Sequence, residues 1–87
     1  LIEPELVISP NPVLVGSLSR LTIKNLPSDQ DITLRVSDGS GKVLIANHMP
    51  YVNGMEVQLT GPTPGLYTIS IIQGATVYSV KMLVAAH

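Results

Sequence analysis

The sequence predicts an all-β fold, a single domain in which seven short strands form a two-layer sandwich, and three observations support this prediction. Stretches of alternating apolar and polar residues recur about every ten residues, the spacing typical of strands in a sandwich. Seven prolines and seven glycines separate these stretches. No window of about 11 residues or more keeps the apolar spacing of an amphipathic helix. The pattern therefore favours strands throughout.

Each predicted strand carries one apolar face. The strands cover residues 5–9, 19–25, 31–37, 42–47, 55–60, 66–72 and 76–84. The alternation is clearest in 31–37, where Ile32, Leu34 and Val36 share one face. A single sheet would leave these faces in water, whereas two packed sheets bury them at about 25 cal/mol per Å².

The first half of the chain contains three predicted strands. Strand 5–9 is followed by Pro10-Asn11-Pro12, whose prolines have no backbone N–H to donate, so this segment should lie at a sheet edge or leave the sheet. Strand 19–25 should point Leu21 and Ile23 inward. After strand 31–37, residues 38–41 (Asp-Gly-Ser-Gly) predict a hairpin turn, because glycine supplies the positive φ of such turns.

The second half contains four predicted strands and two sharp turns. The sequence Gly61-Pro62-Thr63-Pro64-Gly65 turns the chain before strand 66–72, and Gln73-Gly74 joins that strand to the last one. The residues expected to face inward are Met55, Val57 and Leu59 in strand 55–60, and Tyr78, Val80, Met82 and Val84 in the last strand.

Composition narrows the class of protein. Residues 1–87 are enough for one domain, with 45% hydrophobic and 13% charged residues and a net charge of −1. Five scattered Lys and Arg residues do not form the basic stripe of a nucleic-acid-binding protein, and there is no cysteine for a disulfide or a thiolate metal site. The chain begins with Leu1 and contains no export signal, so we expect it to be the tail of a longer protein.

Residues with catalytic or metal-binding chemistry are few. His48, at the end of a short strand, and His87, at the terminus, lack a nucleophile partner in the pattern, so we expect no enzymatic activity. Asp29, Asp31 and Asp38 with Asn25 supply oxygen ligands that Ca²⁺ accepts, but their spacing fits no EF-hand loop. Local turn and loop capping explains them better, and we expect no metal and no cofactor.

Two further segments have structural explanations. Asp38-Gly39-Ser40-Gly41-Lys42 resembles a phosphate cradle in composition, but it joins two strands and lacks the spacing of a P-loop. Tyr67 lies three residues after Pro64, at the start of the penultimate strand. Immunoglobulin-like domains place a tyrosine at this corner, and its hydroxyl bonds back to the chain. We therefore interpret Tyr67 as structural. Tyr51 and Tyr78 could join an exposed patch, but two tyrosines do not make a binding platform.

Four motifs in order resemble those of the C-terminal sorting domain of type IX secretion system cargo in Bacteroidetes. The motif residues are Pro10, Asn11, Pro12 and Val13; Asp38, Gly41 and Lys42; Pro64, Gly65 and Tyr67; and Lys81, Met82, Leu83 and Val84. Each motif alone is weakly specific, and the match extends from about Leu6 to Val84. Two features depart from the family: Ser37 replaces a common aromatic, and Ala85-Ala86-His87 follows the last motif.

The resemblance implies a seven-stranded antiparallel immunoglobulin-like β-sandwich that addresses its protein to the outer membrane. It implies passage through the periplasm and then the outer membrane, with the cell surface or the medium as the destination. The implied partners are the outer-membrane translocon, a sortase-like cysteine protease that removes the domain, and anionic lipopolysaccharide. The alternatives are an uncleaved family member within the surface machinery, an adhesion or carbohydrate-binding module, and an accessory domain beside an enzyme.

The predicted recognition region is the end of the last two strands. Its residues are Gly65, Tyr67, Lys81, Met82, Leu83 and Val84. We expect the last strand and the proline-rich first segment to be sheet edges, which a partner can extend by strand addition. Exposed edges would also allow two copies to pair as a homodimer. The competing interpretation is that these residues only close the sandwich.

Overall fold

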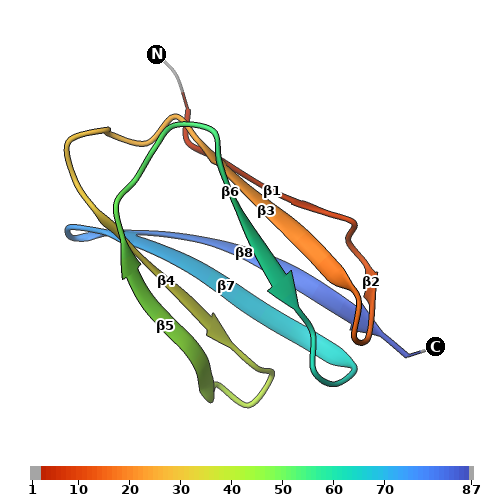
Figure 1. Ribbon diagram of the computed structural model, residues 1–87. Coiled ribbons are helices and arrows are strands. Elements are labelled where there is room, and N and C mark those ends of the chain that lie inside the picture. The colour runs from red at the N-terminus through yellow and green to blue at the C-terminus, as the bar shows by residue number, and fades with distance from the viewer. Residues whose placement is uncertain (1–2, 87) are drawn as a thin grey trace.

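The computed structural model describes residues 3–86, and within them the chain forms strands and no helix (Figure 1). The strands are β1 (Glu5–Ser9), β2 (Val13–Leu14), β3 (Leu18–Lys24), β4 (Ile32–Ser37), β5 (Val43–Met49), β6 (Met55–Thr60), β7 (Gly65–Gln73) and β8 (Thr76–Ala85). One sheet has the order β1-β3-β6 and the other the order β2-β8-β7-β4-β5. The predicted all-β fold with two sheets is confirmed.

The prediction of seven antiparallel strands is wrong because β2 was missed. β2 has two residues and pairs in parallel with the end of β8, through Val13↔Val84 and Leu14↔Ala85. The five-stranded sheet is therefore mixed, whereas the three-stranded sheet is antiparallel. Two residues are too short to show a periodic pattern. The chain leaves the first sheet after β1 and enters the second at β2, as the prolines between them predicted.

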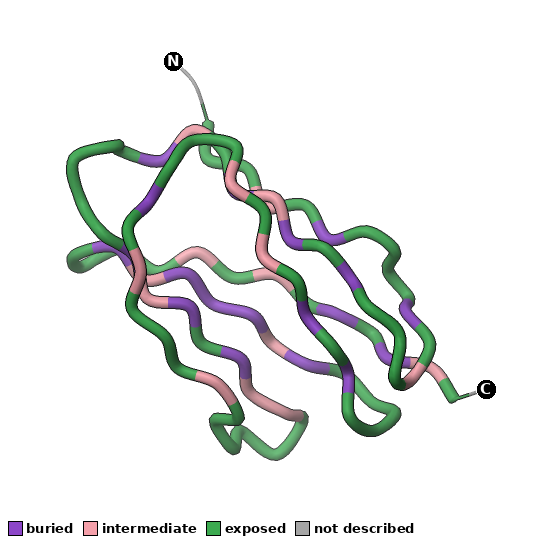
Figure 2. Tube along the Cα trace, in the orientation of Figure 1, coloured by how far each residue is buried: buried purple, intermediate pink, exposed green. Residues whose placement is uncertain are grey.

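The core lies between the two sheets, and buried residues alternate with exposed ones along most strands (Figure 2). Ile32, Leu34 and Val36 of β4 are buried as predicted, and so are Leu21 and Ile23 of β3. The remaining buried apolar residues are Ile8, Val13, Leu26, Tyr51, Leu59, Tyr67, Ile69, Ile71, Met82 and Val84. Aliphatic side chains thus fill most of the core, with two tyrosines beside them.

The longest pairing joins β7 to β8 from Gly65↔Val84 to Gln73↔Thr76. Met82 and Val84 of β8 are buried, and Tyr78 and Val80 are partly buried against the core, so the predicted inner face is confirmed. In β6, Leu59 is buried while Met55 and Val57 are partly buried. The turn between β7 and β8 contains Gly74 with φ of 59°, a conformation that favours glycine.

Candidate recognition surface

Four motifs that lie far apart in the chain meet at one end of the five-stranded sheet (Figure 1). β7 begins and β8 ends there, because Gly65 lies opposite Val84. β2, which follows Pro10-Asn11-Pro12, pairs with β8 at Val84 from the other side. The turn between β4 and β5 borders β7: a Cβ atom added at Gly39 would lie 3.6 Å from the carbonyl oxygen of Leu66. The motifs therefore form one continuous region.

The side chain of Asn11 takes the place of a neighbouring strand beside β8. Its Nδ2 donates to the carbonyl oxygen of Lys81 at 3.0 Å, and its Oδ1 accepts from the backbone N–H of Leu83 at 3.0 Å. Farther along, the N–H of Val15 donates to the carbonyl of Ala85 at 2.9 Å. The edge of β8 is therefore occupied in its last part. The expectation that residues 81–84 offer a free edge for strand addition is wrong.

Tyr67 fixes the corner before β7, as predicted. Its hydroxyl donates to the carbonyl oxygen of Thr63 at 2.7 Å and lies 2.8 Å from Thr63 Oγ1. The N–H of Thr63 also donates to the hydroxyl at 3.3 Å. The ring is buried, and a buried tyrosine hydroxyl normally needs such partners. The role of Tyr67 in the structure is to hold the turn, and its buried ring forms part of the wall of an apolar pocket beside β5.

Asp38 closes the turn between β4 and β5. Its Oδ1 accepts hydrogen bonds from the Ser40 hydroxyl at 2.7 Å, the Ser40 N–H at 2.9 Å and the Lys42 N–H at 3.0 Å. Gly41 follows with φ of 88°, and its N–H donates to the Asp38 carbonyl at 3.0 Å. The Ser40 hydroxyl is the main cause of a lowered Asp38 pKa, helped by the two N–H donors and the Lys42 charge. The predicted hairpin turn is confirmed.

The lowered pKa makes the Asp38 turn sensitive to acid. A carboxyl whose pKa is lower in the folded state stabilises the fold above its unfolded pKa of about 3.9, and loses this effect as pH falls through the folded value. Asp38→Asn should therefore lower Tm at pH 7, and the difference from wild type should shrink on acidification. Thermal unfolding of both proteins at neutral and acid pH measures this. A difference that stays constant would contradict it, and Asp29→Asn, at an exposed loop position, is the control.

The predicted recognition residues divide between core and surface. Tyr67, Met82 and Val84 are buried, because they occupy inward positions of β7 and β8. The side chains of Met82 and Val84 cannot contact a partner in the folded domain, and Tyr67 can be reached only through the pocket that it lines. Gly65 and Lys81 are exposed, as is Leu83 with 44% of its surface accessible. The accessible part of the predicted region is therefore the outward face of the two strands.

An aliphatic and cationic surface covers this outward face. Leu83 lies directly opposite Leu66, and Lys81 lies two residues before Leu83 on the same face. Leu14 of β2 is exposed beside Ala85, which shares the outward face of β8. We call Leu14, Leu66, Lys81 and Leu83 the outer patch. Apolar side chains that neighbour one another at a surface are typical of interaction sites.

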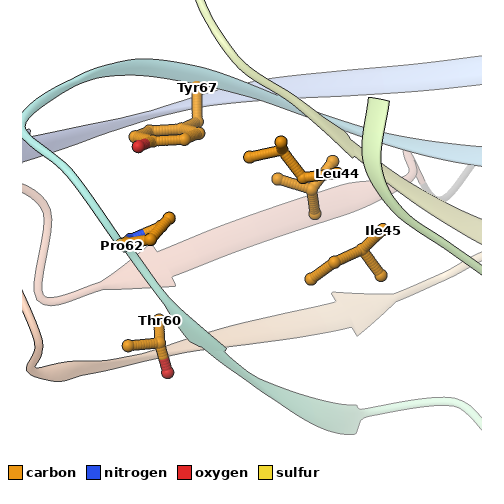
Figure 3. Close-up of a pocket in the computed structure, with 6 residues that line it drawn as sticks. Leu44, Ile45, Thr60, Pro62 and Tyr67 are labelled. Atoms are coloured by element: carbon orange, nitrogen blue, oxygen red, sulfur yellow. The ribbon is translucent and has the colours of Figure 1, made fainter. Parts of the chain in front are cut away.

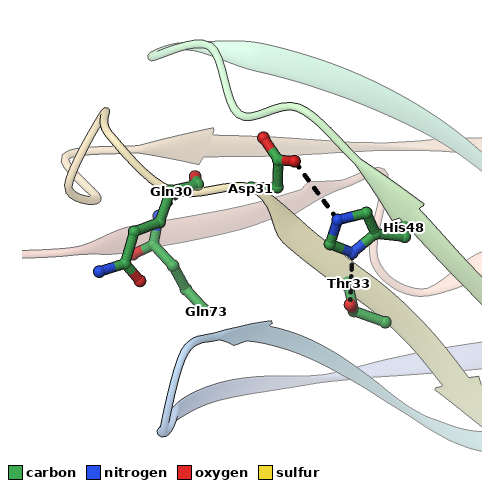
Figure 4. A network of polar contacts seen from close by, with 5 residues as sticks. All are labelled: Gln30, Asp31, Thr33, His48 and Gln73. Atoms are coloured by element: carbon green, nitrogen blue, oxygen red, sulfur yellow. Dashed lines mark hydrogen bonds and ion pairs between the residues drawn. The ribbon is translucent and has the colours of Figure 1, made fainter.

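His48 belongs to an exposed polar cluster on the same outward face, at the β5 edge of the sheet (Figure 4). Its Nδ1 lies 3.2 Å from Thr33 Oγ1, and its Nε2 lies 3.4 Å from Asp31 Oδ2. The residue types resemble a hydrolytic triad. However, the His48 and Asp31 side chains are 67% and 60% exposed, and Thr33 is half-buried on the outward face of the sheet. The cluster is therefore best interpreted as surface pairing across β4 and β5. His87 lies outside the described residues.

The remaining candidates also have structural partners. Tyr51 is buried, accepts from the Leu26 N–H at 3.2 Å and donates to Asn53 Oδ1 at 3.0 Å, so its predicted place in an exposed patch is wrong. Asn25, with φ of 67°, donates its N–H to Asn53 Oδ1 at 2.8 Å. Within residues 3–86, no three His, Asp or Glu side chains lie close enough to hold a metal ion. The same residues contain no helix long and apolar enough to cross a membrane.

Two functional details escaped sequence reasoning. The contact of Asn11 with β8 joins residues 70 and 72 positions apart, and no local pattern encodes such a pairing. Gln73 is buried, and its Nε2 donates to the carbonyls of Pro27 at 2.7 Å and Gln30 at 3.1 Å. The sequence Gln73-Gly74 predicted a turn, and turn residues are usually exposed. Nothing in the sequence therefore indicated that the Gln73 side chain points inward. For the contact between Asn11 and β8, the sequence offered only the Pro10-Asn11-Pro12 segment after the first predicted strand.

Comparisons with known proteins support the fold and no more. No protein-family model and no curated protein matches the chain. Among solved structures, the chain is similar to an engineered protein whose crystal structure was determined at 1.98 Å, with a TM-score of 0.56 and 22% sequence identity. The similarity covers 98% of this chain and 19% of that protein. At this identity the similarity is evidence for the fold alone.

Proposed function

We propose that this chain is a C-terminal sorting domain that directs its protein across the outer membrane through the type IX secretion system. The observation that carries the proposal is the meeting of all four sorting-domain motifs at one end of the five-stranded sheet, where Asn11 bonds to Lys81 and Leu83. In this role the domain is a substrate of the export and attachment machinery and not an enzyme.

The finer fold assignment belongs to the same proposal. An immunoglobulin-like sandwich is supported by the three-stranded and five-stranded sheets, the splitting of the first strand between them, and the tyrosine corner at Tyr67. The proposed partners are the outer-membrane translocon and a sortase-like cysteine protease, with attachment to anionic lipopolysaccharide after cleavage. The domain would pass through the periplasm to the cell surface or the medium.

The outer patch is the surface on which we expect recognition to depend. Leu14, Leu66 and Leu83 supply apolar area, and Lys81 supplies a cation. The edge of β8 is already paired here, so recognition would use side chains on the sheet face and not added backbone hydrogen bonds. Recognition through side chains replaces the strand addition at residues 81–84 that the sequence led us to expect.

A secretion assay with surface variants tests the proposal. A periplasmic reporter fused to this chain is expressed in a bacterium that has a type IX system. The fusion should reach the surface or the medium, and the double variant Lys81→Glu/Leu83→Gln should be retained in the periplasm. Val77→Gln, an exposed position at the far end of β8, is the matched control and should be exported.

The outcome is decisive only for a folded domain. Lys81 and Leu83 are exposed, so the purified double variant should keep a Tm within a few degrees of wild type. Export of this folded variant at the wild-type level would contradict the role of the outer patch. Retention of the wild-type fusion itself would refute the sorting function.

A further inference from the structure

β5 is an edge strand with a free side. It pairs with β4 along its length, and no strand of residues 3–86 pairs with its other side. Its seven residues, Val43 to Met49, are exposed or half-buried. The backbone N–H and C=O groups on the free side therefore face solvent. Such a row of groups can bind another extended chain.

β1, β6 and the last part of β8 carry features that discourage strand addition, and β5 does not. β1 begins with Glu5 and lies between Pro4 and Pro10, while β6 contains Glu56, which pairs with Arg20 at 3.8 Å. The last part of β8 is covered by β2 and Asn11. β5 reads Val-Leu-Ile-Ala-Asn-His-Met, without proline, glycine, lysine or acid. Edge strands usually carry such protective residues, and β5 lacks them. The first part of β8, Thr76 to Val80, lacks them too, but only β5 of these two edges lines an apolar pocket.

An apolar pocket opens beside β5 on the inner side of the sheet (Figure 3). Its volume is about 220 Å³, and its lining residues are Val36, Leu44, Ile45, Thr60, Pro62 and Tyr67. This is below the usual range of about 300 to 1,000 Å³ for drug-sized ligands. The size and the carbon-rich lining suit one or two aliphatic side chains. A strand added to β5 would point every second side chain toward this pocket.

A cation without a counterion lies on the other face of the same edge. Arg35 is exposed on β4 and sits directly across from Ala46, the smallest side chain of β5. Within residues 3–86, Arg35 forms no ion pair. Because Ala46 leaves the space above β5 open, a side chain on an added strand next to Ala46 would face the guanidinium. A carboxylate at that position would complement the charge.

We propose that β5 binds an extended peptide segment in which an acidic residue faces Arg35 and its aliphatic neighbours face the pocket. The backbone of β5 supplies the hydrogen bonds, the pocket selects aliphatic side chains, and Arg35 selects the acid. Pairing with β5 of a second copy fits less well, because β5 itself contains no acid to place beside Arg35. This binding site is separate from the outer patch and does not depend on the proposed sorting function.

A capped, fluorescein-labelled peptide, Leu-Thr-Leu-Glu-Leu-Thr-Leu, is a direct probe. It has the length of β5 and alternates inward leucines with outward polar residues around a central glutamate. Fluorescence anisotropy with the purified chain should show binding about tenfold tighter than for the same peptide with a central lysine. Arg35→Glu should reverse this preference, and Lys24→Glu, an exposed cation on the other sheet, should leave it unchanged.

NMR locates the bound peptide. Amide shifts should concentrate in β5, and methyl shifts at Leu44 and Ile45. Equal binding of the two peptides, no binding at about 1 mM, or shifts concentrated elsewhere, as along Thr76 to Val80 of β8, would overturn the proposal. A purified chain that sediments as a dimer paired through β5 would also overturn it, because a second copy would then be the occupant. Unchanged NMR spectra outside the substituted positions show that the variants are folded.

Discussion

Replacing Gly61 with alanine is expected to lower the free energy of unfolding by about 2 to 3 kcal/mol. Gly61 is buried between the end of β6 and the end of β8, and an added Cβ would overlap both methyl groups of Val84. Val84 cannot move away easily, because β8 is paired there with Gly65 on one side and Val13 on the other. Chemical denaturation of the purified proteins measures the loss.

Two further variants distinguish the overlap between an added Cβ at position 61 and Val84 from a general effect of replacing glycine. Gly39→Ala places a Cβ in ordinary contact, 3.6 Å from the Leu66 carbonyl oxygen, and should change stability by less than about 0.5 kcal/mol. The double variant Gly61→Ala/Val84→Ala removes the overlapping methyls, so its loss should be smaller than the sum of the two single losses. Strict additivity, or a stable Gly61→Ala variant, would contradict the close contact between β6 and β8.

Alternation along the chain was enough to predict the strands that line the core. Ile32, Leu34 and Val36 show why: each lies two residues from the next, and a one-residue shift of register would expose all three. The same rule placed Met82 and Val84 inside. Where one face of a strand is buried and the other is exposed to solvent, the alternation of apolar and polar residues directly predicts which side chains are buried.

The sequence was enough to predict which residues belong to the candidate site, but not how these residues are arranged in space. The motif residues around Lys81 and the inward position of Met82 were visible in the sequence, whereas the pairing of Leu83 with Leu66 follows from the register of β8 against β7. Asn11 lies in the segment that passes from the first sheet to the second, and its side chain bonds to β8. The alternation of apolar and polar residues gives no information about such a contact. The free edge of β5 was equally hidden, because whether a strand lies at an edge is decided by the order of strands in the sheet.

The end of the domain opposite the outer patch depends on one buried amide. Gln73, the last residue of β7, is only 4% exposed. Its Nε2 donates to the carbonyl of Pro27 at 2.7 Å and to that of Gln30 at 3.1 Å. Figure 4 shows the side chains of Gln73 and Gln30. The loop between β3 and β4 is thereby tied to the turn between β7 and β8. No backbone bond holds these two carbonyls among those formed by the turns and loops of residues 3–86.

Gln73→Leu should therefore lower the free energy of unfolding by about 1 to 3 kcal/mol. Leucine preserves the approximate size but removes both hydrogen bonds to Pro27 and Gln30, and each such bond contributes about 0.5 to 1.5 kcal/mol. Gln58→Leu, the same change at an exposed position of β6, should have an effect within about 0.5 kcal/mol. Hydrogen exchange should also become faster in the loop around Pro27 and Gln30. Equal stability of the two variants would show that water replaces the amide and that the loop does not depend on Gln73.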